Sequence, residues 1–254
     1  MHVLALDTTT RDGSVALVDG YRTIEERRGE AARTHGERLP GELLAVADAH
    51  GLSPHTIDLF AVASGPGSFT GLRIGIATIQ GLALTTGRRI VAVSALEALA
   101  QTVGVEGGGA RAPAGTFVAA WMDARRHDVF AALYRLADAP LFSPDRLVEI
   151  EGPTAGDPGI TLARWAGHIR DATVVFVGDG AALYASLITE HASPAWTVLP
   201  YQPLLAGAIG RMAVARAQRG DTIDPAAVRP LYIRRPDVEV ERERGFHHKG
   251  HEGL

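Results

Sequence analysis

The sequence of 254 residues is 46% hydrophobic and 21% charged, the composition of a globular protein with enough material for one large domain or two small lobes. A net charge of −4 argues against a broad basic face for nucleic acid, and the absence of cysteine excludes disulfides, thiolate metal sites and cysteine nucleophiles. No apolar run reaches the roughly 18 residues of a membrane span, and no secretory pattern opens the chain, so we expect a soluble cytoplasmic protein.

The chain opens with a pattern of consecutive strands. Residues 3–6 form a short apolar run, residues 14–18 form a second, and residues 21–28 form a third after the hairpin signal Asp19-Gly20. An acidic, threonine-rich turn follows the first strand; such turns hold a metal–phosphate group in the actin-like, sugar-kinase and Hsp70-type ATPases. The candidate cofactor-binding residues are therefore Asp7, Thr8 and Thr9. A solvated hairpin turn is the alternative.

An amphipathic helix is predicted next, over residues 37–50. Leu39, Leu43 and Val46 recur at helical spacing, and Pro40 suits the first turn. His35 lies just before this pattern. A metal site on a helix usually has a second histidine four residues on, and this chain has Leu39 there, so we do not expect His35 to bind a metal.

The stretch 65–75 is a glycine-rich turn between an apolar strand, 59–63, and a helix, 70–86. Such a turn points backbone N–H groups at an anion or a polar partner. A P-loop would need a lysine after its last glycine, and the chain's one lysine is Lys249. The dinucleotide fingerprint fails as well, because position 70 is Thr70 rather than glycine. We therefore expect these glycines to serve close packing rather than phosphate binding.

The helix 70–86 is apolar on more than one side. Leu72, Ile76 and Ile79 form one stripe, and small residues such as Gly71 and Gly75 recur four apart, a spacing that permits close helix–helix approach. One face can pack on the sheet while another meets a second helix. That second helix is either 37–50 of the same chain or a helix of another chain, and the periodicity leaves both open.

The remaining sequence predicts a second lobe. Residues 1–103 form an N-terminal lobe, which ends with a strand at 90–93 and a helix opened by the capping box 94–97. A glycine-rich linker at 104–115 leads to a C-terminal lobe at 116–240, which again begins with a strand, an acidic turn at 123–128 and a strand. Its last helix, 204–219, is free to pack back on the first lobe. We expect the tail 241–254 to be disordered and its histidines to be incidental.

No catalytic residue is predicted. The turn 65–71 does not match the Gly-x-Ser-x-Gly nucleophile elbow, so Ser68 and Thr70 fit turn or capping roles. The carboxylates Asp7, Asp123 and Asp179 each stand alone at a turn. Acids at equivalent strand ends of two lobes are consistent with an ATP cleft, but no phosphate-clamp signature supports one.

Several motifs together resemble the TsaB (YeaZ) family. They are Leu-Ala-Leu-Asp-Thr-Thr at 4–9, Arg-Thr-His-Gly-Glu-Arg-Leu at 33–39, Gly-Pro-Gly-Ser-Phe-Thr-Gly-Leu-Arg at 65–73, Ser-Ala-Leu-Glu-Ala-Leu at 94–99, Asp-Ala-Arg-Arg at 123–126 and Tyr-Ile-Arg-Arg-Pro at 232–236. The resemblance implies an α/β, two-lobed actin-like ATPase fold (ASKHA, ribonuclease H-like) with mixed sheets flanked by helices. It also implies a non-catalytic scaffold subunit that dimerises with a TsaD-type threonylcarbamoyltransferase, which modifies tRNA next to the anticodon.

Further expectations come with that resemblance. The partners would be the TsaD-type subunit, a TsaE-type ATPase, a second copy of this chain when it is isolated, and tRNA indirectly through the complex. No cofactor or metal is expected on this chain alone, and ATP is left open at the interface of the complex. The predicted interface residues are Leu39, Leu43, Val46, Gly71, Leu72, Gly75, Ile76 and Ile79. Two alternatives stay open: an ATP-dependent kinase or transferase using the inter-lobe cleft, and a metallopeptidase, which the missing histidine pair disfavours.

Overall fold

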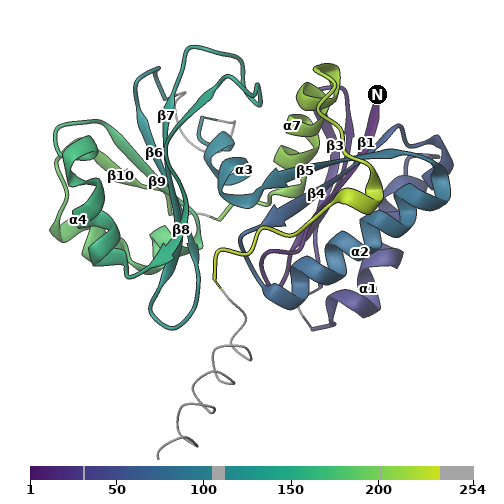
Figure 1. The fold of residues 1–254 in the computed structure, drawn as a ribbon, viewed down its shortest axis with the longest axis horizontal. Helices are drawn as coiled ribbons and strands as arrows, with labels where there is room; N and C mark the ends of the chain where they lie inside the picture. Colours follow the sequence, from purple (N-terminus) through teal and green to yellow (C-terminus); the bar gives the residue numbers. More distant parts are fainter. Residues whose placement is uncertain (31, 105–111, 201, 235–254) are drawn as a thin grey trace, which may run out of the picture.

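The computed structural model describes residues 1–30, 32–104, 112–200 and 202–234, and contains two five-stranded mixed sheets (Figure 1). The first sheet has the order β3-β2-β1-β4-β5. Its strands are β1 (His2–Asp7), β2 (Ser14–Asp19), β3 (Arg22–Arg28), β4 (Leu59–Gly65) and β5 (Arg89–Ser94). The three opening strands pair antiparallel, whereas β4 pairs parallel with β1 and with β5. The predicted opening hairpins are confirmed.

The second sheet repeats the topology of the first. Its strands are β6 (Phe117–Asp123), β7 (Val129–Leu136), β8 (Leu147–Gly156), β9 (Val174–Val177) and β10 (Trp196–Val198), in the order β10-β9-β6-β7-β8. The strand β6 pairs antiparallel with β7 and parallel with β9, as β1 does with β2 and β4. This duplication confirms the two-lobed fold of mixed sheets flanked by helices.

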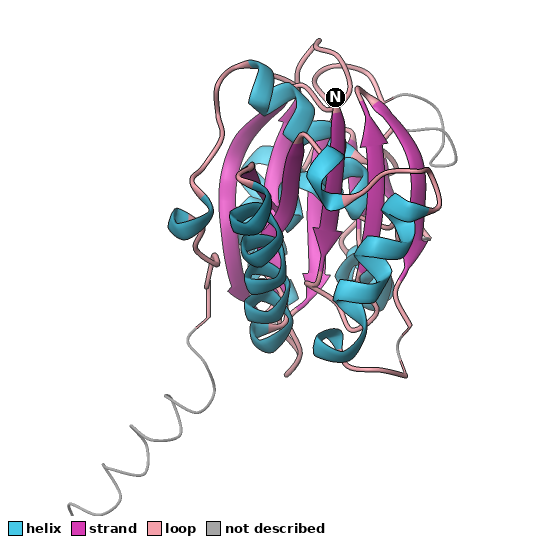
Figure 2. Cartoon of the chain, turned by 90° about the vertical axis from the view of Figure 1, so that its right-hand side faces the viewer, coloured by secondary structure: helices cyan, strands magenta, loops and turns pink. Residues whose placement is uncertain are grey.

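Helices alternate with the sheets in layers. The helices α1 (His35–Asp48) and α2 (Phe69–Thr86) cover the outer face of the first sheet, and α3 (Ala95–Gln101) and α7 (Ala206–Gln218) lie between the sheets (Figure 1). The outer face of the second sheet is covered by α4 (Pro158–Ile169), α5 (Asp179–Leu183) and α6 (Ala185–Glu190). Figure 2 looks at the outer side of the first lobe, where helices lie in front of the strands. Short 3-10 turns occupy Pro54–Thr56 and Pro225–Ala227.

Alternate side chains of a strand point to opposite faces of the sheet and belong to different hydrophobic cores. Along β1, Leu4 and Leu6 face α1 and α2, whereas Val3 and Ala5 join a central core shared with α3, α7 and the second sheet. The helix α7 packs on the first sheet at Gly210, where an added Cβ would lie 2.6 Å from Val18 Cγ2. Among the described helices, none is long and apolar enough to cross a membrane.

In the second lobe, the sequence predicts a strand at 147–150 and a helix at 181–188. Strand β8 runs beyond the first of these to Gly156, and the second is the pair of short helices α5 and α6, which meet at Tyr184. Strand β10 is not predicted, because three residues are too short to show alternation. Most of the predicted linker, residues 105–111, and the tail 241–254 lie outside the described residues.

Candidate functional site

The glycine-rich turn between β4 and α2 packs directly on the turn after β1. An added Cβ at Gly67 would lie 2.5 Å from Thr9 Cβ, and at Gly71 it would lie 2.3 Å from the carbonyl oxygen of Thr8. At Gly75 it would lie 2.2 Å from Thr8 Oγ1. Contacts this short admit only glycine. The prediction that these glycines serve close packing is confirmed.

Two hydrogen bonds fix the start of α2. The backbone N–H of Ser68 donates to the carbonyl of Thr9 over 2.8 Å, and Ser68 Oγ accepts from the N–H of Gly71 over 3.2 Å. Ser68 is therefore the N-cap residue of α2, as its type and position suggested. The N–H groups of Ser68 and Gly71 are therefore bound by the protein's own atoms.

The three cofactor candidates come together at the end of β1, but they are buried. Asp7 is 3% exposed, and its Oδ1 accepts hydrogen bonds from the N–H and the hydroxyl of Thr9, over 2.9 and 2.7 Å. Thr8 is fully buried against α2. Burial raises the pKa of Asp7, and the negative charge of Asp179 raises it further, although the hydrogen bonds from Thr9 oppose the change.

The second lobe contributes a matching acid at its own strand ends. Asp179, the first residue of α5, accepts hydrogen bonds at Oδ1 from the N–H groups of Asp123 and Gly180, over 3.0 and 2.9 Å. Burial raises the pKa of Asp179. Asp123 in turn accepts from the N–H of Arg125 over 2.8 Å and pairs with its guanidinium over 2.9 Å. The sequence shows that these acids lie at turns, but it does not show that backbone N–H groups donate hydrogen bonds to their carboxylates.

Asp7 and Asp179 border one small void together with Ser14 and Gly178. Its volume of about 20 Å³ is enough for about one water molecule. A metal-bound triphosphate does not fit into this void, but Thr9 and Asp179 also line a wider cleft. The assignment of Asp7, Thr8 and Thr9 as cofactor-binding residues stays a prediction.

A wider cleft of about 570 Å³ lies between the lobes. It is lined by the turns that follow β1 and β6, by the first residues of α1 and α2, and by residues 231–234. Arg11, Arg125 and Arg234 are among its charged residues, and Phe69 and Tyr232 among its aromatic ones. Its volume lies in the range of small-molecule sites.

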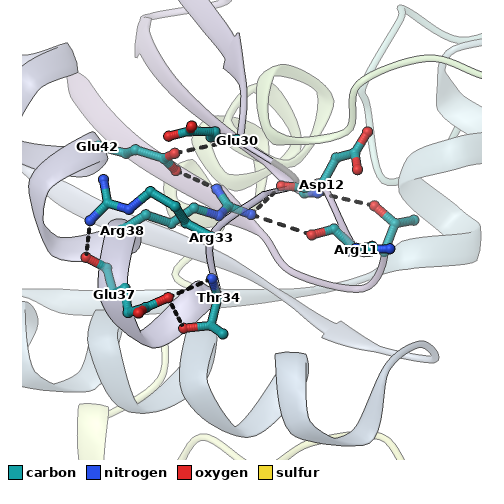
Figure 3. A network of polar contacts seen from close by, with 10 residues as sticks. Arg11, Asp12, Glu30, Arg33, Thr34, Glu37, Arg38 and Glu42 are labelled. Carbon is teal, nitrogen blue, oxygen red and sulfur yellow. Dashed lines mark hydrogen bonds and ion pairs between the residues drawn. The ribbon is translucent and has the colours of Figure 1, made fainter.

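A network around Arg38 attaches α1 to the turn after β1 (Figure 3). The guanidinium of Arg38, which is 2% exposed, donates to the carbonyls of Asp12 and Arg11 and pairs with Glu42. The neighbouring His35 has a buried Nε2 without a hydrogen-bond partner, and burial lowers the pKa of this imidazole, with the charge of Arg38 adding to the effect. In the described part of the chain, no three His, Asp or Glu side chains converge as metal ligands.

The predicted interface residues lie inside the first lobe. Leu39, Leu43, Val46, Gly71, Leu72, Gly75, Ile76 and Ile79 are all buried, with side chains such as Leu43 and Ile79 fully covered. Most of the apolar ones pack on the sheet in one cluster with Leu4 and Phe60. The apolar stripe on either helix thus faces the lobe's own core, and the contact of these residues with a partner stays a prediction.

We call the side of α1 and α2 opposite that stripe the outer face. On α2 it consists of Thr70, Arg73, Ala77, Gly81 and Leu84, and on α1 of Glu37, Pro40, Gly41, Leu44, Ala45 and Asp48, all of which are exposed. Leu84 is 60% exposed and Leu44 is 43% exposed. Arg73 is the charged residue of the α2 part, and Glu37 and Asp48 are those of the α1 part.

Comparisons with known proteins point to one family. The chain matches the family model described as TsaD, tRNA N6-adenosine threonylcarbamoyltransferase, over residues 27–239. It is 33% identical to an uncharacterised protein of Mycobacterium leprae across 93% of this chain, and spans 56% of that relative's length. It is 38% identical to the tRNA threonylcarbamoyladenosine biosynthesis protein TsaB of Escherichia coli, across 53% of this chain and 55% of that protein.

Two solved structures share the fold of this chain. YeaZ from Pseudomonas aeruginosa aligns with a TM-score of 0.71 at 28% identity, covering 91% of this chain and 99% of that one. The activator of a 2-hydroxyisocaproyl-CoA dehydratase from Clostridium difficile, with bound ADPNP, aligns at 12% identity with a TM-score of 0.50 across 87% of this chain and 97% of that one, and shares the fold alone. The resemblance inferred from the motifs is confirmed, and the chain belongs to the family of the tRNA N6-adenosine threonylcarbamoyltransferase model, within its TsaB (YeaZ) group.

Proposed function

We propose that this protein is a non-catalytic subunit in the formation of threonylcarbamoyladenosine in tRNA, and that it docks a TsaD-type catalytic subunit on the outer face of α1 and α2. The observation that carries the proposal is the outer face itself, a pair of adjacent exposed helix surfaces on which small and apolar residues such as Gly41, Leu44, Ala77, Gly81 and Leu84 are exposed. The TsaB name of its relatives supplies the pathway.

The buried acids support a role without chemistry. Oδ1 of Asp7 and Oδ1 of Asp179 accept hydrogen bonds from groups of the chain itself. The void that both acids border has a volume of only about 20 Å³. A kinase or transferase would need these positions open to a metal and a phosphate. The structure therefore favours the scaffold over the ATP-dependent enzyme.

The outer face has the steric properties of a helix-docking surface. An added Cβ at Gly41 or Gly81 would meet nothing within 4 Å, so a partner's backbone can approach closely at both positions. Isolated apolar residues such as Leu84 are common on surfaces, but Leu84, Ala77 and Leu44 are all exposed on these two neighbouring helices.

The family comparison favours one partner. The model that matches this chain is that of the threonylcarbamoyltransferase itself, so the catalytic subunit shares this fold and would present an equivalent pair of helices. Two such pairs can pack as a four-helix bundle across a pseudo-twofold axis. The same face would pair two copies of this chain when it is isolated, and contact with a TsaE-type ATPase and with tRNA would come through the assembled complex in the cytoplasm.

A glutamate on the outer face tests the proposal. We expect Gly81→Glu to abolish co-elution with the TsaD-type subunit of the same organism, because it places a charge in the buried interface. Gly167→Glu is the matched control, since Gly167 is also an exposed helical glycine with open space around it, on α4 of the second lobe. Circular dichroism would verify folding of both variants. Co-elution of Gly81→Glu at the wild-type level would refute the docking face.

Glutamate at Gly75 would be a poor test. Its Cβ alone would lie 2.2 Å from Thr8 Oγ1, so loss of binding could not be separated from loss of folding.

A further inference from the structure

Residues 230–234 cross from the first lobe to the second at the mouth of the wide cleft (Figure 1). The N–H of Leu231 donates to the carbonyl of Ser64, at the end of β4, over 2.7 Å. Three residues later, Arg234 donates to the carbonyl of Ala124 over 3.0 Å and forms an ion pair with Asp128, both in the turn after β6. We call residues 230–234 the inter-lobe strap.

The strap is also locked against the start of α2. The ring of Tyr232 lies 4.9 Å from the ring of Phe69, and its hydroxyl accepts a hydrogen bond from Nε of Arg73 over 2.9 Å. The guanidinium of Arg73 in turn stacks over the Phe69 ring, with its Cζ 3.9 Å from the centroid. One turn of α2 therefore holds the strap through a three-residue stack.

The stack belongs to the outer face at the same time. Arg73 is the charged member of the exposed stripe of α2, and Tyr232 and Leu231 are 39% and 38% exposed beside it. Further along the same flank of α2, Gln80 donates to the carbonyl of Pro225 over 2.7 Å. A partner on the outer face would thus contact the strap as well as the helices, through residue types that often dominate binding energy at interfaces.

The turn that Arg234 holds is strained. Arg125, Arg126 and His127 all have left-handed backbone conformations, with φ of 61°, 55° and 66°. Such a run costs free energy for residues other than glycine and persists only where neighbouring contacts fix it. The bonds from Arg234 are two of those contacts, so losing them would favour a rearranged turn.

The lobes are also joined by the central core that the two sheets share with α3 and α7. At its edge, Arg219 of α7 pairs with Asp145 in the loop before β8, and Arg211 stacks over Phe142 with its Cζ 3.8 Å from the ring centroid. Release of the strap would therefore let the lobes shift about these remaining contacts rather than separate.

We propose that the strap couples partner docking to the angle between the lobes. This inference rests on the proposed function, since it assigns a regulatory role to the same docking face. The partner binds Arg73 and Tyr232 in the arrangement that the strap imposes, and the strap imposes it fully only while Arg234 holds the second lobe. By linkage, docking then stabilises the closed arrangement, and loss of closure weakens docking.

Arg234→Ala tests the coupling, because Arg234 faces the cleft and the second lobe rather than the outer face. We expect it to weaken the affinity for the TsaD-type subunit about tenfold in isothermal titration, within the usual range of coupling between sites. Arg164→Ala is the matched control, since it removes a comparable ion pair with Glu151 on the far side of the second lobe and should leave the affinity unchanged.

A distance measurement separates coupling from direct contact. The chain has no cysteine, so spin labels at Arg22→Cys and Ile160→Cys would report one distance between the lobes. We expect a narrow distribution in the otherwise unaltered chain, a broader one in Arg234→Ala, and return to the narrow one when the partner is added. Unchanged affinity in Arg234→Ala would overturn the coupling, as would reduced affinity with an unchanged distance distribution.

The proposed function fails in a different way. If the unaltered chain does not bind the TsaD-type subunit, the docking face is refuted, whereas the label distances in the isolated chain still test whether Arg234 holds the lobes together.

Discussion

Asp7 of the first lobe and Asp179 of the second border the same small void, and the charge of Asp179 adds to burial in raising the pKa of Asp7. Both carboxylates are held by donors of the chain itself: the N–H and hydroxyl of Thr9 for Asp7, and the N–H groups of Asp123 and Gly180 for Asp179.

Replacing either acid should stabilise the protein at neutral pH. A carboxyl whose pKa is raised on folding is penalised when ionised, so the wild-type protein loses stability as pH rises from the unfolded-state pKa through the folded-state pKa. Asp7→Asn keeps the acceptor for Thr9 and removes that penalty. We expect a gain of about 0.5–2 kcal/mol at pH 7 that shrinks toward zero near pH 3, measured by urea denaturation.

Asp145→Asn provides the contrast for that series. The guanidinium of Arg219 lowers the pKa of the Asp145 carboxyl, so this exposed residue should give no gain at neutral pH. A loss of stability in Asp7→Asn that is the same at every pH would show that the Asp7 carboxylate is not penalised by burial.

The isolated chain should not bind MgATP. The void between the acids holds about one water molecule, and the glycines before α2 pack on Thr8 and Thr9. Isothermal titration of the purified protein with ATP and Mg²⁺ should therefore give only heats of dilution. A saturable signal that Asp7→Asn abolishes would restore the ATP-dependent enzyme as the better description.

Periodicity predicted where the helices and strands lie, but not which face of α2 is buried. The predicted helix 70–86 agrees with Phe69–Thr86 within one residue, because a strand and a glycine-rich turn precede the helix and Gly87 ends it. Leu72 and Leu84 are the same residue type on that helix, yet they are 1% and 60% exposed. A helix that is apolar on all sides gives no local signal to separate the two, so the interface prediction selected the buried face.

The candidate site depended even more on contacts between distant residues. The motif at 232–236 was noted for its resemblance, but nothing local to it predicts that Tyr232 stacks on Phe69 or that Arg234 reaches Asp128. Likewise, Asp7 and Asp179 look like available acids in sequence, since burial and backbone donors come only from the folded chain. Sequence patterns show which residues could act, and packing determines which of them are free to do so.

Loss of Arg38 should strongly destabilise the first lobe. Its guanidinium is buried and joins the turn after β1 to Glu42 of α1, so Arg38→Met leaves the carbonyl of Asp12 and the partly buried Glu42 without their donor (Figure 3). We expect a cost of about 3–5 kcal/mol in chemical denaturation. Arg38→Lys should recover little of it, because one ammonium group cannot reproduce the fork that reaches both partners. Full recovery by lysine would show that charge alone matters there.

Two glycines on α2 should respond to alanine in opposite directions. Gly75→Ala places a Cβ 2.2 Å from Thr8 Oγ1 and should cost about 1–3 kcal/mol, the usual penalty of overpacking. Gly81→Ala meets nothing within 4 Å and should stabilise the helix by about 0.5–1 kcal/mol. Thr8→Ala removes the clashing hydroxyl, so the double variant Thr8→Ala/Gly75→Ala should be more stable than the sum of the two single changes predicts, by 1 kcal/mol or so. Strict additivity in urea denaturation would mean that Gly75 is needed for some reason other than its contact with Thr8.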